Sequence, residues 1–270
     1  MRKLSIPEIL DESFAIYRSN FGLLFSIALI PNVVLAAFGA ILGLQIVAVN
    51  EQDFGQMLNI FAIAMLVLVI GMLAMEIANG AMTSAISEKI LGRSATIGSS
   101  YGRVGRRMGE FIGYLFLKYL VIFVGLMFCF IPGIIFSILL YVSICAFVIE
   151  NMGPKEALER SWALVKNDFF RVLGIAIIIG IISWVISFAV NFLFSLVVSG
   201  SVGAAASSTV EGSVATTSMT IAILGGVIQG LAAAAVAPLM AAVVTITYYD
   251  LRVRKEGFDL ERLAESLGGR

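Results

Sequence analysis

Long apolar runs alternate with short polar segments along the whole chain. Each of four runs is long enough to cross a hydrocarbon layer about 30 Å thick: 21–49, 57–87, 169–198 and 219–248. The run between Phe111 and Glu150 has room for two spans, 111–130 and 133–150. We expect it to fold back at the sequence CFIPG, because Pro132 cannot continue the hydrogen bonding of a helix. The pattern predicts an all-α, polytopic membrane domain over residues 1–249, with six transmembrane helices in three hairpins and a tail at 250–270.

A shorter, amphipathic helix is expected in front of each hairpin. In the segment 154–168 the apolar side chains recur at spacings of four, three and four, and charged residues occupy the other side. Gly153 and Pro154 open this segment, and proline is favoured at the first helical position because its missing N–H has no partner there anyway. The apolar residues of this stripe are Leu158, Trp162, Val165 and Phe169. We interpret the segment as a cytoplasmic, interfacial helix that leads directly into a membrane span.

The start of the chain repeats this arrangement. Ser5 and Glu8 have the spacing of a capping box, and an apolar face follows as far as Phe21. Placing Glu8 opposite Glu156 also aligns Ser13 with Ser161. The segment 96–111 is a weaker third copy. Either the chain contains three repeats of one unit, or helices at the cytoplasmic surface converge on the same pattern.

Composition agrees with a membrane protein. The chain is 60% hydrophobic and 13% charged, with a mean hydropathy of +1.00, whereas soluble domains carry roughly 25% charged residues. The formal net charge is zero, so no global field favours nucleic acid as a partner. The apolar run after the N-terminal segment is too long for the core of a cleaved signal peptide. Cys129 and Cys145 lie in apolar segments, and we interpret them as small hydrophobic residues.

The positions of the basic residues predict the orientation. Of the 18 Lys and Arg, 17 lie on one side of a six-span protein or at the helix ends on that side, and Lys118 alone lies inside a span. The opposite side has only acids: Glu51, Asp53 and Glu211. By the positive-inside rule, both termini are expected to be cytoplasmic.

Charged groups inside spans are costly, so Glu76 and Lys118 are the first candidates for a site. Their depths are compatible with an ion pair. The alternatives are that Lys118 extends to the headgroups, or that one of the two moves a proton or contacts a substrate.

Two further sets of polar residues are candidates. Asn79 shares a face with Glu76, and Asn191 belongs to a stripe of Ser183, Ser187 and Ser195. Such stripes line a solute pathway or hydrogen-bond to neighbouring helices.

The cluster of Arg103, Arg106 and Arg107 is the candidate contact for anionic phospholipid headgroups. The alternative is that these arginines serve only to keep their loop on the cytoplasmic side.

Three separated motifs, SIPEILDESFAIYRSNF, the segment from Ile131 to Gly174, and YYDLRVRKEGFDLERLAE, resemble the membrane domain of some glycerophosphoryl diester phosphodiesterases and of stand-alone prokaryotic membrane proteins of unknown role. The resemblance covers nearly the whole chain. It implies a six-helix module in a prokaryotic plasma membrane that accompanies lipid metabolism. It does not imply the enzyme activity, because the phosphodiesterase domain relies on histidine and this chain has none.

The sequence shows no phosphate-binding loop, no metal-ligand spacing and no nucleophile beside a base. We therefore expect neither an enzyme nor a cofactor. The expected function is a module that organises or regulates a protein partner at its cytoplasmic face. The alternative is a carrier or channel for a lipid-like or small solute.

Overall fold

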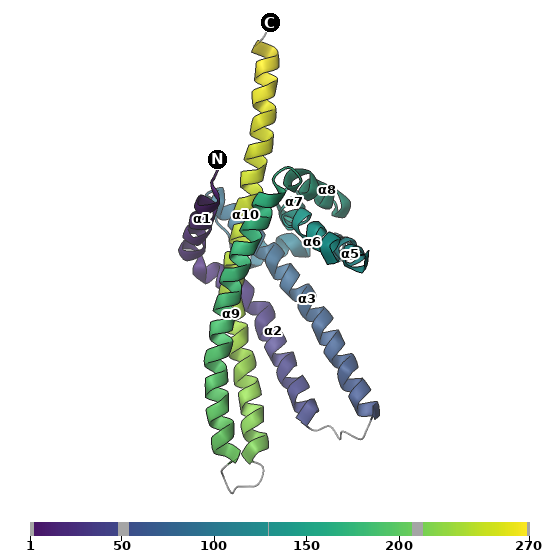
Figure 1. Ribbon diagram of the computed structural model, residues 1–270, viewed down its shortest axis with the longest axis vertical. Coiled ribbons are helices and arrows are strands. Elements are labelled where there is room, and N and C mark those ends of the chain that lie inside the picture. Colours follow the sequence, from purple (N-terminus) through teal and green to yellow (C-terminus); the bar gives the residue numbers. More distant parts are fainter. Residues whose placement is uncertain (1–2, 48–53, 129, 207–212, 269–270) are drawn as a thin grey trace. The chain divides into compact units, whose positions relative to one another are not determined.

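In the computed structural model, which describes residues 3–47, 54–128, 130–206 and 213–268, every regular element is a helix (Figure 1). The helices are α1 (Ile6–Ser19), α2 (Phe21–Val47), α3 (Phe54–Ile90), α4 (Ile97–Gly105), α5 (Met108–Phe128), α6 (Phe130–Leu139), α7 (Ser143–Ile149), α8 (Pro154–Val165), α9 (Phe169–Ala206) and α10 (Ser213–Gly268). The predicted all-α class is confirmed.

Several helices are long and apolar enough to cross a membrane. Five such segments occur in the described part of the chain: Phe54–Ile90, Met108–Phe128, Phe130–Ile149, Phe169–Leu196 and Leu224–Gly257. A sixth results if α1 and the start of α2, which are bent by 84° to each other, count as one span. The chain is therefore a multi-pass membrane protein in contact with lipid. The arrangement of the spans as three hairpins stays a prediction.

The chain divides into two compact units. Unit 1 consists of Met1–Leu24, Asn79–Ile181 and Pro238–Arg270, and unit 2 consists of Phe25–Ala78 and Ile182–Ala237. Unit 1 therefore contains the whole of α1 and of α4 to α8, together with the C-terminal part of α10 from Pro238 onward. The long helices α2, α3, α9 and α10 each contribute a segment to both units.

The helical segments of unit 2 approach one another through small residues. A Cβ atom added to Gly71 of α3 would collide with Leu35 of α2, and one added to Gly225 of α10 would collide with Phe194 of α9. Gly230 lies beside Asn32, because an added Cβ would be 3.6 Å from the Asn32 carbonyl oxygen. Close helix contact at small residues is the usual packing device of membrane proteins.

Local capping fixes the starts of the short helices in unit 1. The Ser5 backbone N–H donates to Glu8 Oε2 at 2.7 Å, and the Glu8 N–H donates to Ser5 Oγ at 3.4 Å, so the predicted capping box is confirmed. At α8, the Gly153 N–H donates to Glu156 Oε2 at 3.1 Å. Helix α4 begins in the same way at Thr96, which exchanges hydrogen bonds with Ser99.

Helices α5 and α6 form a tight hairpin. Gly125 of α5 faces Gly133 of α6, and a Cβ atom on Gly125 would lie 3.0 Å from the Gly133 Cα. Helix α5 ends at Phe128 and α6 begins at Phe130, so Pro132, which was expected to interrupt the helix, lies in the first turn of α6, where its missing N–H leaves no hydrogen bond unmade. Cys129 itself lies outside the described residues.

The expected span 133–150 is not one continuous helix. It is divided into α6 and α7 by a turn at residues 140–142. Ser143 stabilises this turn, because its Oγ donates a 2.6 Å hydrogen bond to the Leu140 carbonyl oxygen. The same Oγ lies 2.8 Å from Tyr114 Oη. Tyr114 in turn packs against Phe111 and Phe147 in the core of unit 1.

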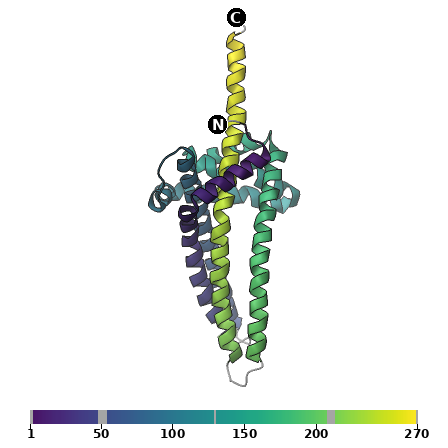
Figure 2. The ribbon, with the colours of Figure 1, turned by 90° about the vertical axis from the view of Figure 1, so that its left-hand side faces the viewer.

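The expected boundary between residues 249 and 250 is not a helix end. Helix α10 runs without interruption from Ser213 to Gly268, so the last predicted span and the tail are parts of one helix of 56 residues. Within unit 1, α1 crosses this helix (Figure 2).

Candidate functional site

A buried carboxylate on α10 ties the start of the chain to two helices. The Asp250 side chain is completely buried. Its Oδ1 accepts a 2.8 Å hydrogen bond from the Leu4 backbone N–H, and its Oδ2 accepts from Arg171 Nη2 at 3.0 Å and from Arg254 Nε at 2.8 Å. Both guanidinium groups also donate to the Leu4 carbonyl oxygen. We call Leu4, Arg171, Asp250 and Arg254 the Asp250 cluster.

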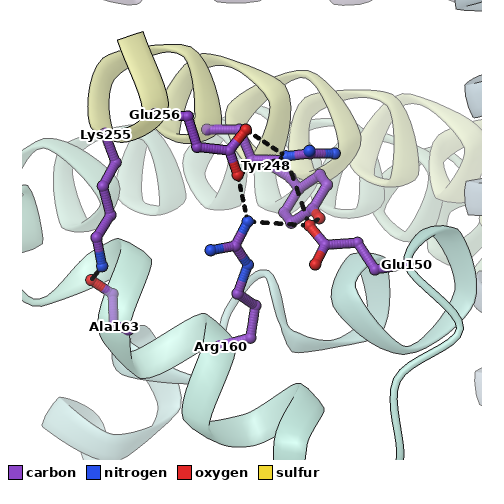
Figure 3. A network of polar contacts seen from close by, with 7 residues as sticks. Glu150, Arg160, Ala163, Tyr248, Lys255 and Glu256 are labelled. Carbon is purple, nitrogen blue, oxygen red and sulfur yellow. Dashed lines mark hydrogen bonds and ion pairs between the residues drawn. The ribbon is translucent and has the colours of Figure 1, made fainter. Parts of the chain in front are cut away.

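A second set of polar side chains joins α10 to α7 and α8 (Figure 3). Glu150 Oε1 lies 3.2 Å from Arg160 Nη2 and 3.4 Å from Arg252 Nε, and it accepts a hydrogen bond from the Tyr248 hydroxyl. Glu256 pairs with both arginines, at 3.1 Å from Arg252 Nε. We call Glu150, Arg160, Tyr248, Arg252 and Glu256 the Glu150 cluster.

The electrostatics of the Glu150 cluster favour the charged form of Arg160. Burial by itself would lower the pKa of Arg160, but the hydrogen bonds and the charges of Glu256 and Glu150 outweigh burial, so the pKa lies above its ordinary value. Two carboxylates and two guanidinium groups share the cluster, and each carboxylate is bonded to both guanidinium groups. Such an arrangement neutralises buried charge and fixes the helices that carry it.

Two further contacts extend the attachment of α10. Lys255 Nζ donates to the Ala163 carbonyl oxygen of α8 at 3.1 Å (Figure 3). Tyr249 Oη lies 2.8 Å from Ser87 Oγ at the end of α3. One stretch of α10, from Tyr248 to Glu256, is therefore bonded to the N-terminal segment, α3, α8, α9 and the residue after α7.

The three arginines that were predicted to contact anionic lipid differ in their partners and exposure. Arg103 pairs with Glu88, and Arg107 pairs with Glu110 and donates to the Met152 carbonyl oxygen at 3.0 Å. The Arg107 guanidinium also lies 4.7 Å from the centre of the Phe147 ring. Arg106, which follows α4 directly, is exposed. Headgroup binding by these residues stays a prediction, and Arg106 is the most accessible of the three.

The polar residues predicted inside spans fall into different environments. Glu76 belongs to unit 2 and Lys118 to unit 1, so their pairing stays a prediction. The Lys118 ammonium lies 5.9 Å from the Tyr114 ring centre and 5.5 Å from that of Tyr119. Asn79 is half-buried on α3.

Asn191 is bonded to a neighbouring helix. Gln229 Nε2 of α10 donates to Asn191 Oδ1 at 3.2 Å, and Asn191 Nδ2 donates to the Ser187 carbonyl oxygen at 2.8 Å. The side chains of Ser187, Asn191 and Ser195 are exposed on α9. Within unit 2, this part of the stripe bonds one helix to the next.

Sequence reasoning missed the two clusters. Asp250 and Glu150 each follow directly on a long apolar run. That position was a usable signal, because a carboxylate at the end of a span that is otherwise flanked by Lys and Arg needs a partner. From the sequence, Arg160, Arg171, Arg252 and Arg254 were interpreted only as determinants of topology. Within the described ranges, no group of three or more Cys, Asp and Glu residues is arranged to hold a metal ion.

Comparison with known proteins gives one family. The family described as Domain of unknown function (DUF7847) matches residues 54–251, which is most of the chain and includes Glu150, Arg171 and Asp250. No curated protein and no solved structure matches the chain.

Proposed function

Since the chain belongs to the DUF7847 family, whose shared domain has no known role, we propose a function from the geometry: a non-catalytic membrane module that holds or regulates a protein partner through its C-terminal helix. The proposed location is the plasma membrane of a prokaryote, with both termini in the cytoplasm. The lopsided distribution of Lys and Arg supports this orientation.

The observation that carries the proposal is the attachment of α10 in unit 1. The stretch from Tyr248 to Glu256 is held by both clusters, and the same helix continues to Gly268. A helix that is fixed at its base keeps one direction relative to unit 1. A partner that binds to α10 beyond Gly257 therefore meets a helix that is already ordered, which lowers the entropy cost of binding.

The chemistry of the clusters also supports a structural role. The carboxylates of Glu150, Asp250 and Glu256 are bonded to arginines within the same protein. The resemblance to the membrane domain of glycerophosphoryl diester phosphodiesterases supports a partner in lipid or envelope metabolism.

A carrier or channel remains the second candidate, because Asn191 and Gln229 place carboxamides on otherwise apolar helices. Their hydrogen bond to each other fits the helix-to-helix role of such groups better than the lining of a pathway.

The test is affinity purification of the full chain from native membranes after mild cross-linking. It is repeated with a variant that lacks residues 258–270, because a deletion from residue 250 would remove the clusters as well. The proposal expects one reproducible companion protein that is lost on deletion of 258–270 while the variant stays folded. A companion that survives the deletion, or solute uptake by the purified protein in vesicles without any companion, would contradict it.

A further inference from the structure

We propose that the α5–α6 hairpin does not cross the bilayer and instead inserts as an apolar wedge into the acyl chains of the single leaflet next to α8. This inference is independent of the proposed partner of α10. It leaves the number of crossings even, so both termini stay on the same side.

The first step is the level of α8 relative to water. Lys155 and Glu159 of α8 form an ion pair with 3.5 Å between Nζ and Oε1, and their side chains are 81% and 64% exposed. A charged pair with this exposure is costly in hydrocarbon and belongs at the membrane surface or in water. Helix α8 therefore marks the polar boundary on its side of the bilayer.

The second step is that α8 lies along the side of the hairpin and contacts it at more than its base. Near the start of α5, a Cβ atom on Gly113 would lie 3.8 Å from Pro154, the first residue of α8. Two turns further along α8, the Trp162 ring is centred 5.9 Å from the Phe136 ring of α6. Between these points, Ser161 Oγ donates to the Leu139 carbonyl oxygen at 2.8 Å.

The third step is the short distance from α8 to the tip of the hairpin. Phe136 lies six residues after Phe130, so the tip extends only about 9 Å along α6 beyond the contact with Trp162, at a rise of about 1.5 Å per residue. The Phe136 ring also lies against Gly125, which is three residues before the end of α5. A crossing hairpin would have to carry its tip about 30 Å from the polar boundary.

The length of α6 agrees with this limit, whereas α5, with 21 residues, would be long enough to cross. Helix α6 has 10 residues, or about 15 Å, which is half of the hydrocarbon thickness. It ends at the turn of residues 140–142. Within unit 1, the hairpin runs crosswise to α10 (Figures 1 and 2).

The last step is the chemistry of the tip. Met127, Phe128, Phe130 and Ile131 are 72%, 84%, 70% and 65% exposed, and no polar side chain occurs between Leu120 and Phe136. A tip that emerged in water on the far side would expose all four apolar side chains there. The segment between the predicted spans 21–49 and 57–87, which is expected on the far side, contains Glu51 and Asp53 instead, as expected for a turn in water. The occupant that fits the tip is the acyl-chain region of a leaflet.

The test is the depth of a nitroxide spin label at position 130 in the full chain, reconstituted in phosphatidylcholine and phosphatidylglycerol vesicles. The variant is Phe130→Cys with Cys129→Ser and Cys145→Ser, and Glu51→Cys in the same background marks the far side. We expect the label at 130 to be accessible to oxygen and inaccessible to a water-soluble nickel complex. The label at 51 should show the reverse.

The wedge is rejected if the label at 130 is as accessible to the nickel complex as the label at 51, because that result places the tip in the far headgroup region. A second variant, Phe128→Cys, guards against a local effect of one substitution. If the labels at both 128 and 130 are accessible to the nickel complex only from the side of α8, the hairpin lies in water on that side and the wedge is also rejected.

Discussion

The Arg171 guanidinium at the start of α9 lies 3.0 Å from the fully buried carboxylate of Asp250 on α10, and the same carboxylate accepts a hydrogen bond from the Leu4 N–H. Residues that are 246 positions apart in the sequence therefore meet at one side chain. Since the carboxylate has no access to water, these partners replace the hydrogen bonds that water would make.

Asp250→Asn is expected to destabilise unit 1 strongly. The substitution keeps the shape of the side chain but leaves Arg171 and Arg254 without a charged partner, at a cost of about 3 kcal/mol. Chemical denaturation in detergent, followed by circular dichroism, measures the change.

The matched control is Glu159→Gln, which breaks the exposed pair with Lys155. An exposed pair contributes less than about 1 kcal/mol. Equal losses for the two substitutions would contradict the structural role that we assign to Asp250.

Glu150 and Arg160 should be energetically coupled. Both side chains are mostly buried, at 14% and 22% exposure, and they are 3.2 Å apart. A double-mutant cycle with Glu150→Gln and Arg160→Met should give a coupling free energy of about 1–2 kcal/mol. Additive effects would show that the contact contributes nothing of its own to stability.

Gly133→Ala should disrupt the hairpin between α5 and α6. The added Cβ would collide with the Leu126 side chain and lie 3.0 Å from the Leu126 backbone nitrogen, which cannot move aside. We expect a loss of about 1–3 kcal/mol, measured as faster proteolysis near the hairpin.

Gly98→Ala in α4 serves as the control. No atom lies within 4 Å of the added Cβ there. Alanine at an unhindered helix position stabilises by about 0.5–1 kcal/mol relative to glycine. A loss at residue 98 as large as that at residue 133 would exclude steric collision as the cause.

Asn191→Leu distinguishes the two candidate functions. If the Asn191–Gln229 hydrogen bond only joins α9 to α10, the change should cost about 0.6 kcal/mol of stability. Companion binding should not change. Loss of solute uptake by this variant, with its fold intact, would favour the carrier instead.

The sequence predicted those features that depend on neighbours along the chain. Ser5 and Glu8 lie three residues apart, so the spacing in the sequence is enough to predict their capping box. The break at residues 140–142 was not predictable, because it involves Tyr114, which is 29 residues away from Ser143. The Asp250 cluster escaped prediction for the same reason, since no local pattern links Leu4 to α10.

The uninterrupted length of α10 was also missed. The change from apolar to charged residues near Tyr249 was interpreted as the end of a span and therefore of a domain. A helix does not end where its environment changes, because its backbone hydrogen bonds are local and satisfied within the helix in lipid and in water alike.

The central claim is that the side carrying both clusters and the C-terminal helix faces the cytoplasm. Its most direct test is the labelling of intact cells with a membrane-impermeant maleimide. The full chain carries Glu159→Cys or Glu51→Cys in a background with Cys129→Ser and Cys145→Ser. We predict that the cysteine at 51 is labelled in intact cells and the cysteine at 159 only after permeabilisation. Labelling of position 159 from outside intact cells would contradict the account.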